Sequence, residues 1–102
     1  MPNGRSKNWI RLCAAIDGFR VRYNQWPTKI RLNIIYYESI RSLFKPDDFR
    51  ELINKLQFVI DDAHFVAEDD TGRTYDYSKE SFPDTKPPIQ AREWLGVKPD
   101  FD

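Results

Sequence analysis

The spacing of the apolar residues changes at Trp26-Pro27 from helical periodicity to strand alternation, and this change constrains the fold most. Before it, apolar residues from Trp9 to Tyr23 recur at the three- and four-residue intervals of one helix face. After it, residues 28–32 alternate an apolar side chain with Lys or Arg, the pattern of a half-buried strand. A long helix followed at once by a strand predicts an α+β fold.

Local signals place the limits of the next elements. We expect the first helix to end near Asn24, because the residue before a proline avoids the helical region. Asn33 is a suitable N-cap for a second helix running to about Phe44. The alternative is that the strand continues through residues 34–36, whose side chains favour strands.

The middle of the chain predicts a short third helix and then an antiparallel portion. Asp48 and Glu51 have the spacing of a capping box and begin the helix. Gly72 suits the left-handed position of a hairpin loop. The strands are expected to be a buried one at residues 57–60, then residues 64–68 and 73–77.

The composition shifts near the C-terminus. Residues 81–88 are rich in proline and predict an extended connector, followed by a short helix at residues 89–95 that ends at Gly96. Trp94 is the expected anchor of that helix. We therefore expect one domain, with a compact core in residues 1–80 and a docked tail in residues 81–102. Its helices should pack on one face of a short, mainly antiparallel sheet.

The chain contains enough apolar residues for a core without a metal or disulfide, since 40% are hydrophobic and 15% aromatic. The expected core is Trp9, Leu12, Ile16, Phe19, Ile30, Leu32, Ile40, Leu43, Phe49, Leu52, Ile53, Val59, Phe65 and Trp94.

The cysteine content and the apolar runs indicate a cytoplasmic protein. Cys13 is the only cysteine, which excludes an internal disulfide and a cysteine-based zinc site. No apolar run has the length of a signal peptide or a membrane span, so a membrane partner is not expected. No cofactor motif is present either.

The two halves of the sequence carry opposite charge. Residues 1–45 contain nine Lys and Arg against two Asp and Glu, and residues 46–102 contain seven against fourteen. Such asymmetry favours a charged partner, although two halves of a small domain also neutralise each other when they fold together.

Two charged surfaces are candidate binding sites. The basic one consists of Arg11, Arg22, Lys29 and Arg31, and it suits a nucleic-acid backbone or an acidic protein. Outward Lys and Arg on a strand also protect a sheet edge from aggregation. The acidic one consists of Asp61, Asp62, Glu68, Asp69 and Asp70, and it suits a mimic of nucleic acid that competes for a nucleic-acid-binding protein.

Catalysis and metal binding have weaker support in the sequence. His64 lies near Asp61 and Asp62, which is half of a general-base arrangement, but no activated nucleophile accompanies it. The acidic loop lacks the ligand spacing of a calcium-binding EF-hand.

The sequence therefore predicts a small, non-catalytic binding or inhibitory module that acts on a protein partner through a charge-polarised surface. A nucleic-acid binder using the basic half is the first alternative, and a minor enzyme using His64 is the second. Self-association is a further option, because Ala14, Ala15 and Gly18 give the first helix a side with small residues.

Overall fold

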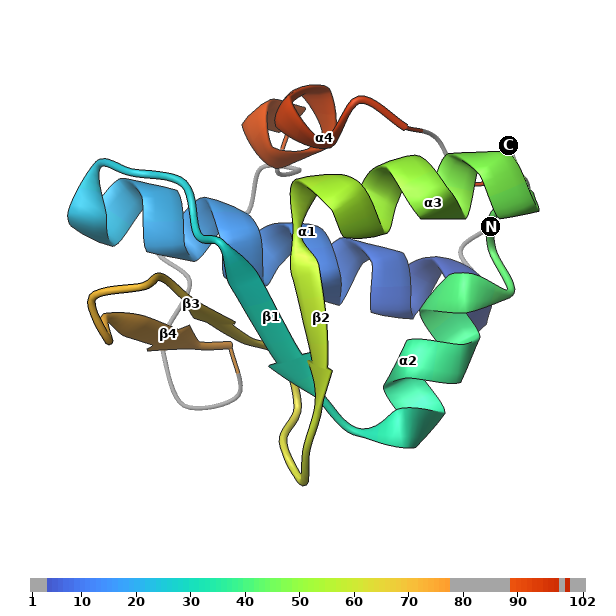
Figure 1. The fold of residues 1–102 in the computed structure, drawn as a ribbon, viewed down its shortest axis with the longest axis horizontal. Helices are drawn as coiled ribbons and strands as arrows, with labels where there is room; N and C mark the ends of the chain where they lie inside the picture. The colour runs from blue at the N-terminus through green and yellow to red at the C-terminus, as the bar shows by residue number, and fades with distance from the viewer. Residues whose placement is uncertain (1–3, 78–88, 98, 100–102) are drawn as a thin grey trace.

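The computed structural model describes residues 4–77, 89–97 and 99, which form four helices and one four-stranded sheet (Figure 1). The helices are α1 (Gly4–Tyr23), α2 (Ile34–Arg41), α3 (Pro46–Lys55) and α4 (Ile89–Leu95). The strands are β1 (Lys29–Leu32), β2 (Gln57–Ile60), β3 (Val66–Glu68) and β4 (Thr74–Asp76). The predicted α+β class is confirmed.

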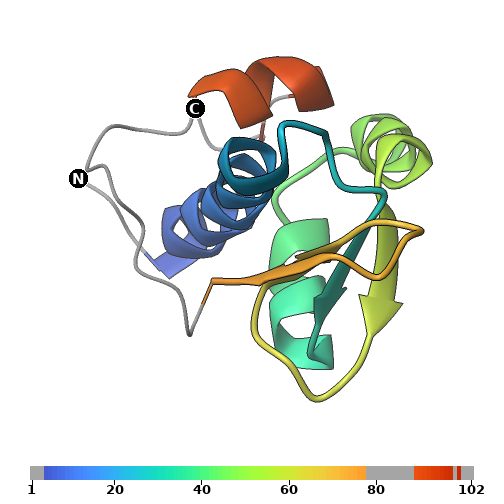
Figure 2. The ribbon, with the colours of Figure 1, turned by 90° about the vertical axis from the view of Figure 1, so that its left-hand side faces the viewer.

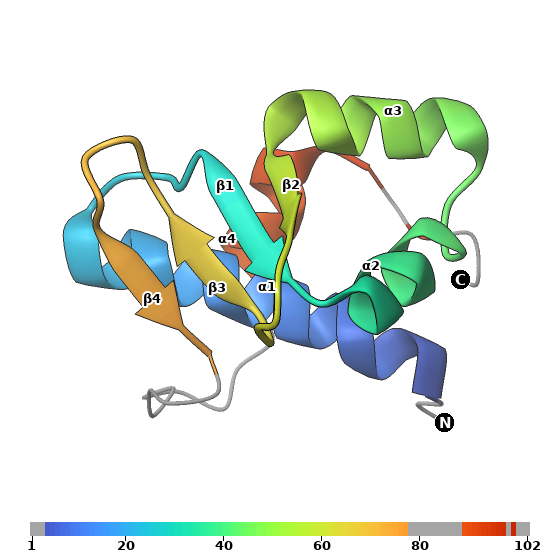
Figure 3. The same cartoon turned by 60° about the horizontal axis from the view of Figure 1, so that its bottom comes forward.

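The sheet is mixed, with the strand order β2-β1-β3-β4 (Figure 3). The β1–β3 and β3–β4 pairs are antiparallel, in line with the mainly antiparallel sheet expected. The β1–β2 pair is parallel, because α2 and α3 carry the chain back to the starting end of the sheet before β2 begins. β1 is therefore a central strand, so its Lys and Arg do not protect an edge, whereas β2 is an edge strand.

One face of the sheet packs against α1 and the other is open. Ile30 and Leu32 of β1, Ala67 of β3 and Tyr75 of β4 are buried on the α1 side. Figure 2 shows α1 and α4 together on that side of the sheet. In Figure 3 the opposite face is turned toward the viewer, and none of the described elements crosses it.

The end of α1 and the start of α2 lie where the sequence predicted them. Asn24 has a left-handed φ of 58° and ends α1 directly after Tyr23. The side chain of Asn33 accepts a hydrogen bond of 2.9 Å from the Tyr36 backbone N–H and caps α2. The alternative prediction, in which the strand continues through residues 34–36, is therefore wrong. The helix α2 ends at Arg41, three residues before the expected Phe44.

The third helix begins earlier than predicted. Lys45 occupies the N-cap position and Pro46 the first helical turn, where its fixed φ is favourable. Asp48 lies inside the first turn, so the predicted capping box is wrong. Asp47 and Asp48 there interact favourably with the positive end of the helix dipole.

The core contains most of the expected residues, with three exceptions. Ile53 is 40% exposed on α3 and Val59 lies on the open face of the sheet. Trp94 is partly buried and packs against the core from α4. The exposure of these three side chains depends on the order of the strands and on how each helix is rotated about its axis. The spacing of apolar residues within one element does not predict either of these.

An aromatic stack fixes α4 to the rest of the fold. The rings of Trp94 and Trp26 are nearly parallel, with centroids 4.6 Å apart. Arg20 lies over the Trp26 ring and Lys55 over the Trp94 ring. Trp94 is thus the anchor that the sequence predicted, while the proline-rich connector at residues 81–88 lies outside the described residues.

None of the helices in the described part of the chain is long and apolar enough to cross a lipid bilayer.

Candidate functional site

The four residues of the predicted basic surface lie on two different sides of the molecule. Arg11 and Arg22 belong to α1. Lys29 and Arg31 alternate with the buried Ile30 and Leu32 and therefore point to the open face of the sheet, away from α1. Arg11 donates a hydrogen bond to Asn8, and Arg22 lies over the Tyr75 ring.

Arg31 joins the predicted basic and acidic surfaces on the open face. Its Nη1 donates to Asp61 at 2.9 Å, and its Nε and Nη2 donate to the two oxygens of Glu68 at 3.2 and 3.0 Å. The hydrogen bonds to Glu68 and then to Asp61 raise the pKa of the guanidinium above its usual value. The pairing of Arg31 with both acids neutralises charge that the sequence assigned to two separate surfaces.

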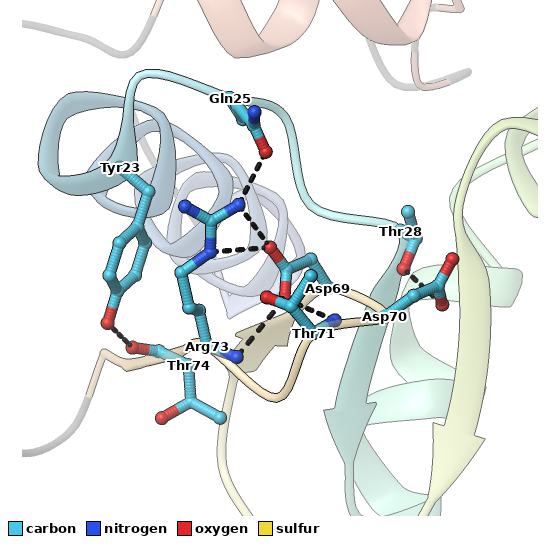
Figure 4. A network of polar contacts seen from close by, with 8 residues as sticks. All are labelled: Tyr23, Gln25, Thr28, Asp69, Asp70, Thr71, Arg73 and Thr74. Carbon is cyan, nitrogen blue, oxygen red and sulfur yellow. Dashed lines mark hydrogen bonds and ion pairs between the residues drawn. The ribbon is translucent and has the colours of Figure 1, made fainter.

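Asp69 organises the hairpin between β3 and β4 (Figure 4). One of its oxygens accepts hydrogen bonds from the Thr71 hydroxyl and from the backbone N–H groups of Thr71 and Arg73. The other accepts from the Arg73 guanidinium at 2.8 Å, and Arg73 also donates to Gln25. The side chain of Asp69 is 7% exposed, so this carboxylate is a structural group.

These contacts reverse the effect of burial on Asp69. Loss of solvent around the carboxyl raises its pKa, but the hydrogen bonds from Thr71 and Arg73 outweigh this and lower the pKa to about 2. The same hairpin is tied to neighbouring elements by Tyr23, whose hydroxyl donates to the Thr74 carbonyl, and by Thr28, which donates to Asp70 (Figure 4).

Asp61 and Asp62 remain at the exposed turn after β2. The Asp62 backbone N–H donates to Asp61 at 2.7 Å, and this bond and the one from Arg31 lower the pKa of Asp61. Of the five predicted acidic residues, Asp61 and Glu68 therefore hold Arg31, Asp69 holds Arg73, and Asp70 holds Thr28. Asp62 is exposed at the end of the edge strand.

His64 lies on the surface, where its Nδ1 is 3.2 Å from the Tyr36 hydroxyl. Cys13 is fully buried in α1, and this burial raises the pKa of its thiol. Among residues 4–77, 89–97 and 99, no group of three or more His, Cys, Asp and Glu side chains is placed to hold a metal ion.

An apolar surface along β2 was missed by the sequence analysis. A groove of about 370 Å³ beside this strand is lined by Tyr37, Ile53, Gln57, Phe58 and Ile60. Ile60 is 48% exposed, and Ile34 and Ile35, at the end of the sheet where β2 stops, are more exposed still. The residue types of β2 predicted a buried strand, but its four residues are all partly or fully exposed.

The backbone of β2 also faces outward. The N–H groups of Gln57 and Asp61 donate to the carbonyls of Thr28 and Leu32, beside β1. Because successive backbone groups of a strand point to opposite sides, the N–H and C=O of Phe58 and Ile60 point away from β1. Within the described residues, the strand order places no neighbour on that side.

Comparison of the chain with protein-family models, with curated proteins and with solved structures found no match. We define the β2 edge as the outward backbone of Phe58 and Ile60 together with the groove residues Tyr37, Ile53 and Gln57.

Proposed function

We propose that this chain is a non-catalytic protein-binding module, and that it recognises an extended protein segment along the β2 edge. The observation that carries the proposal is an uncharged edge strand whose outward backbone lies beside an apolar groove. An added strand would satisfy the N–H and C=O groups of Phe58 and Ile60, and alternate side chains of that strand would enter the groove.

The composition of β2 supports this proposal. Soluble proteins protect edge strands with charged residues, prolines or bulges, because an open edge pairs readily with other chains. β2 has the sequence Gln-Phe-Val-Ile and carries none of these devices, whereas the central strand β1 carries Lys29 and Arg31. The four-residue length of β2 and the charged residues Lys55 and Asp61 next to it restrict pairing to a short segment, and an apolar edge of this kind is expected where pairing with another chain has a function.

The charged surfaces give less support to the nucleic-acid-binding alternative than the β2 edge gives to protein binding. A phosphate backbone running along one side of the molecule would meet either Arg11 and Arg22 or Lys29 and Arg31, but not all four. Arg31 is moreover held by Asp61 and Glu68. We assign the remaining exposed charge, such as that of Asp62, to steering and orientation of a protein partner.

A site-specific photo-crosslinker tests the proposal. Placed at Gln57 in the full-length protein inside its own cells, it should give adducts with another polypeptide. The same group at Thr71, which is also exposed but lies on the β3–β4 hairpin, on the other side of β1 from the β2 edge, is the control and should give no comparable adduct. Introduction of Ile60→Lys should remove the Gln57 adducts.

Two results would contradict the proposal. One is a set of adducts that is equally strong at Thr71, and the other is a Gln57 adduct that persists with Ile60→Lys. Fluorescence anisotropy with labelled duplex DNA, single-stranded DNA and RNA tests the nucleic-acid alternative, since tight binding that weakens steeply with salt would favour that function instead.

A further inference from the structure

We infer that the segment accepted by the β2 edge is the same strand of a second copy, so that two chains form a symmetric dimer with one continuous sheet. This inference rests on the proposed function and names its partner. The edge is self-complementary in its backbone, in its apolar side chains and in the charges at its two ends.

The charges at the ends of β2 favour an antiparallel pair. Lys55 lies two residues before the strand, and Asp61 and Asp62 follow it directly. When a second copy runs in the opposite direction, Lys55 of each copy lies near Asp62 of the other copy, whereas Asp61 is already paired with Arg31. Two such contacts form at once, because a twofold axis repeats every contact.

The backbone geometry selects the register. Residues directly opposite in an antiparallel pair share one face of the sheet, and those that exchange hydrogen bonds must both point outward. Phe58 opposite Ile60 of the second copy satisfies both conditions, because both residues lie on the helix side and both direct their backbone groups away from β1. Val59 then lies on the twofold axis, opposite Val59 of the second copy.

The same register buries the apolar groove. Ile60 of each copy would lie over Phe58 of the other and would cover part of the groove that Tyr37 and Ile53 line. Ile53 and Ile60 are 40% and 48% exposed in the single chain, and the dimer would remove much of this surface from water. A contact built on one short strand is small, so we expect a reversible dimer that dissociates on dilution.

The first experiment measures mass against concentration for the full-length protein by sedimentation velocity. The wild type should pass from monomer to dimer as the concentration rises, and Ile60→Lys should stay monomeric over the same range. Ile10→Lys is the matched control, because Ile10 is also 48% exposed but lies on α1, and it should dimerise like the wild type. Circular dichroism checks that all three chains are folded.

A charge exchange tests the antiparallel direction. Lys55→Glu alone and Asp62→Lys alone should each weaken dimerisation about tenfold, because each places two like charges at both ends of the interface. An equimolar mixture of these two variants should restore it, since every facing pair is then opposite in charge. Restoration in the mixture also shows that loss of the Lys55 contact with Trp94 did not cause the weakening.

A cysteine on the axis tests the register. Cα atoms of a pair without mutual hydrogen bonds lie about 4.5 Å apart, which is within disulfide range. Val59→Cys should therefore crosslink into a covalent dimer under mild oxidation. Val66 lies on the open face of β3, so Val66→Cys is the control and should not crosslink. The native Cys13 is buried and should not react in either variant.

The outcomes separate this inference from the proposed function. A chain that remains monomeric at all concentrations, or a dimer that Ile60→Lys leaves intact, overturns the inference. If the Gln57 crosslink then captures a different protein and Ile60→Lys prevents it, the β2 edge binds protein but its partner is not a second copy. If neither experiment gives an adduct or a dimer, both proposals are wrong.

Discussion

Replacement of Gly18 tests how tightly α1 is packed on the sheet. A Cβ atom at this position would lie 2.3 Å from Cζ and 2.4 Å from Cε1 of Tyr75. Carbon atoms in contact are normally about 3.5–4.0 Å apart, so the tyrosine ring would have to move by more than about 1 Å. The ring is 3% exposed and lies between α1 and β4, which leaves little room for this movement.

Two opposing contributions set the magnitude for Gly18→Ala. Overpacking of a buried site costs about 1–3 kcal/mol, and the severe overlap with Tyr75 places this variant at the upper end. Alanine is favoured over glycine in a helix by about 1 kcal/mol. The free energy of unfolding should therefore fall by about 2 kcal/mol, which corresponds to a decrease in Tm of roughly 10 °C.

Urea unfolding followed by tryptophan fluorescence measures this change. Val21 of α1 is 66% exposed, so the pair Val21→Ala and Val21→Gly measures the intrinsic alanine preference of the same helix. In a Tyr75→Leu background the added methyl group has space, and Gly18→Ala should then be neutral or stabilising. The packing argument would be refuted if Gly18→Ala alone matched the wild type, or if its cost were unchanged in the Tyr75→Leu background.

Three further predictions concern the hairpin, α4 and the start of α2. The pKa of Asp69 lies below its unfolded value of 3.8, so this residue contributes stability above about pH 4 that is lost as the pH falls toward 2. The difference in urea midpoint between the wild type and Asp69→Asn should therefore shrink over that interval, and a constant difference would contradict the argument. Trp94→Ala should lower the free energy of unfolding by about 2 kcal/mol and remove the near-ultraviolet circular dichroism of the Trp26 stack. Asn33→Ala should cost about 1 kcal/mol in the same urea assay and Asn33→Asp much less, because only the former removes the cap of α2.

The elements predicted best are those that depend on neighbouring residues. The end of α1 at Asn24, the cap at Asn33 and the left-handed Gly72 of the hairpin each follow from local backbone preferences. The start of α3 was misjudged because Asp48 and Pro46 both offer a local start signal, and the proline at the first turn prevails. When two such signals compete, the packing of the whole helix decides at which of them the helix begins.

The position of β2 could not be predicted in the same way. A run of apolar residues indicates burial, but burial of a strand depends on its neighbours in the sheet, which come from distant parts of the chain. The crossover through α2 and α3 places β2 beside β1 and at the edge, so that Val59 reaches the open face and Ile60 is half exposed. The candidate site was therefore hidden in residues that the sequence assigned to the core.

Part of the charge asymmetry of the sequence is neutralised inside the fold, which was one of the two explanations that the sequence offered. Arg31 comes from the basic half, and its partners Asp61 and Glu68 come from the acidic half. Charges that are far apart in the chain thus meet across the strands of one sheet, and part of the asymmetry holds the fold together. Near β2, Lys29 and Lys55 lie at the start of the strand and Asp62 follows its end, and a strand with opposite charges at its two ends is complementary to itself when it is reversed.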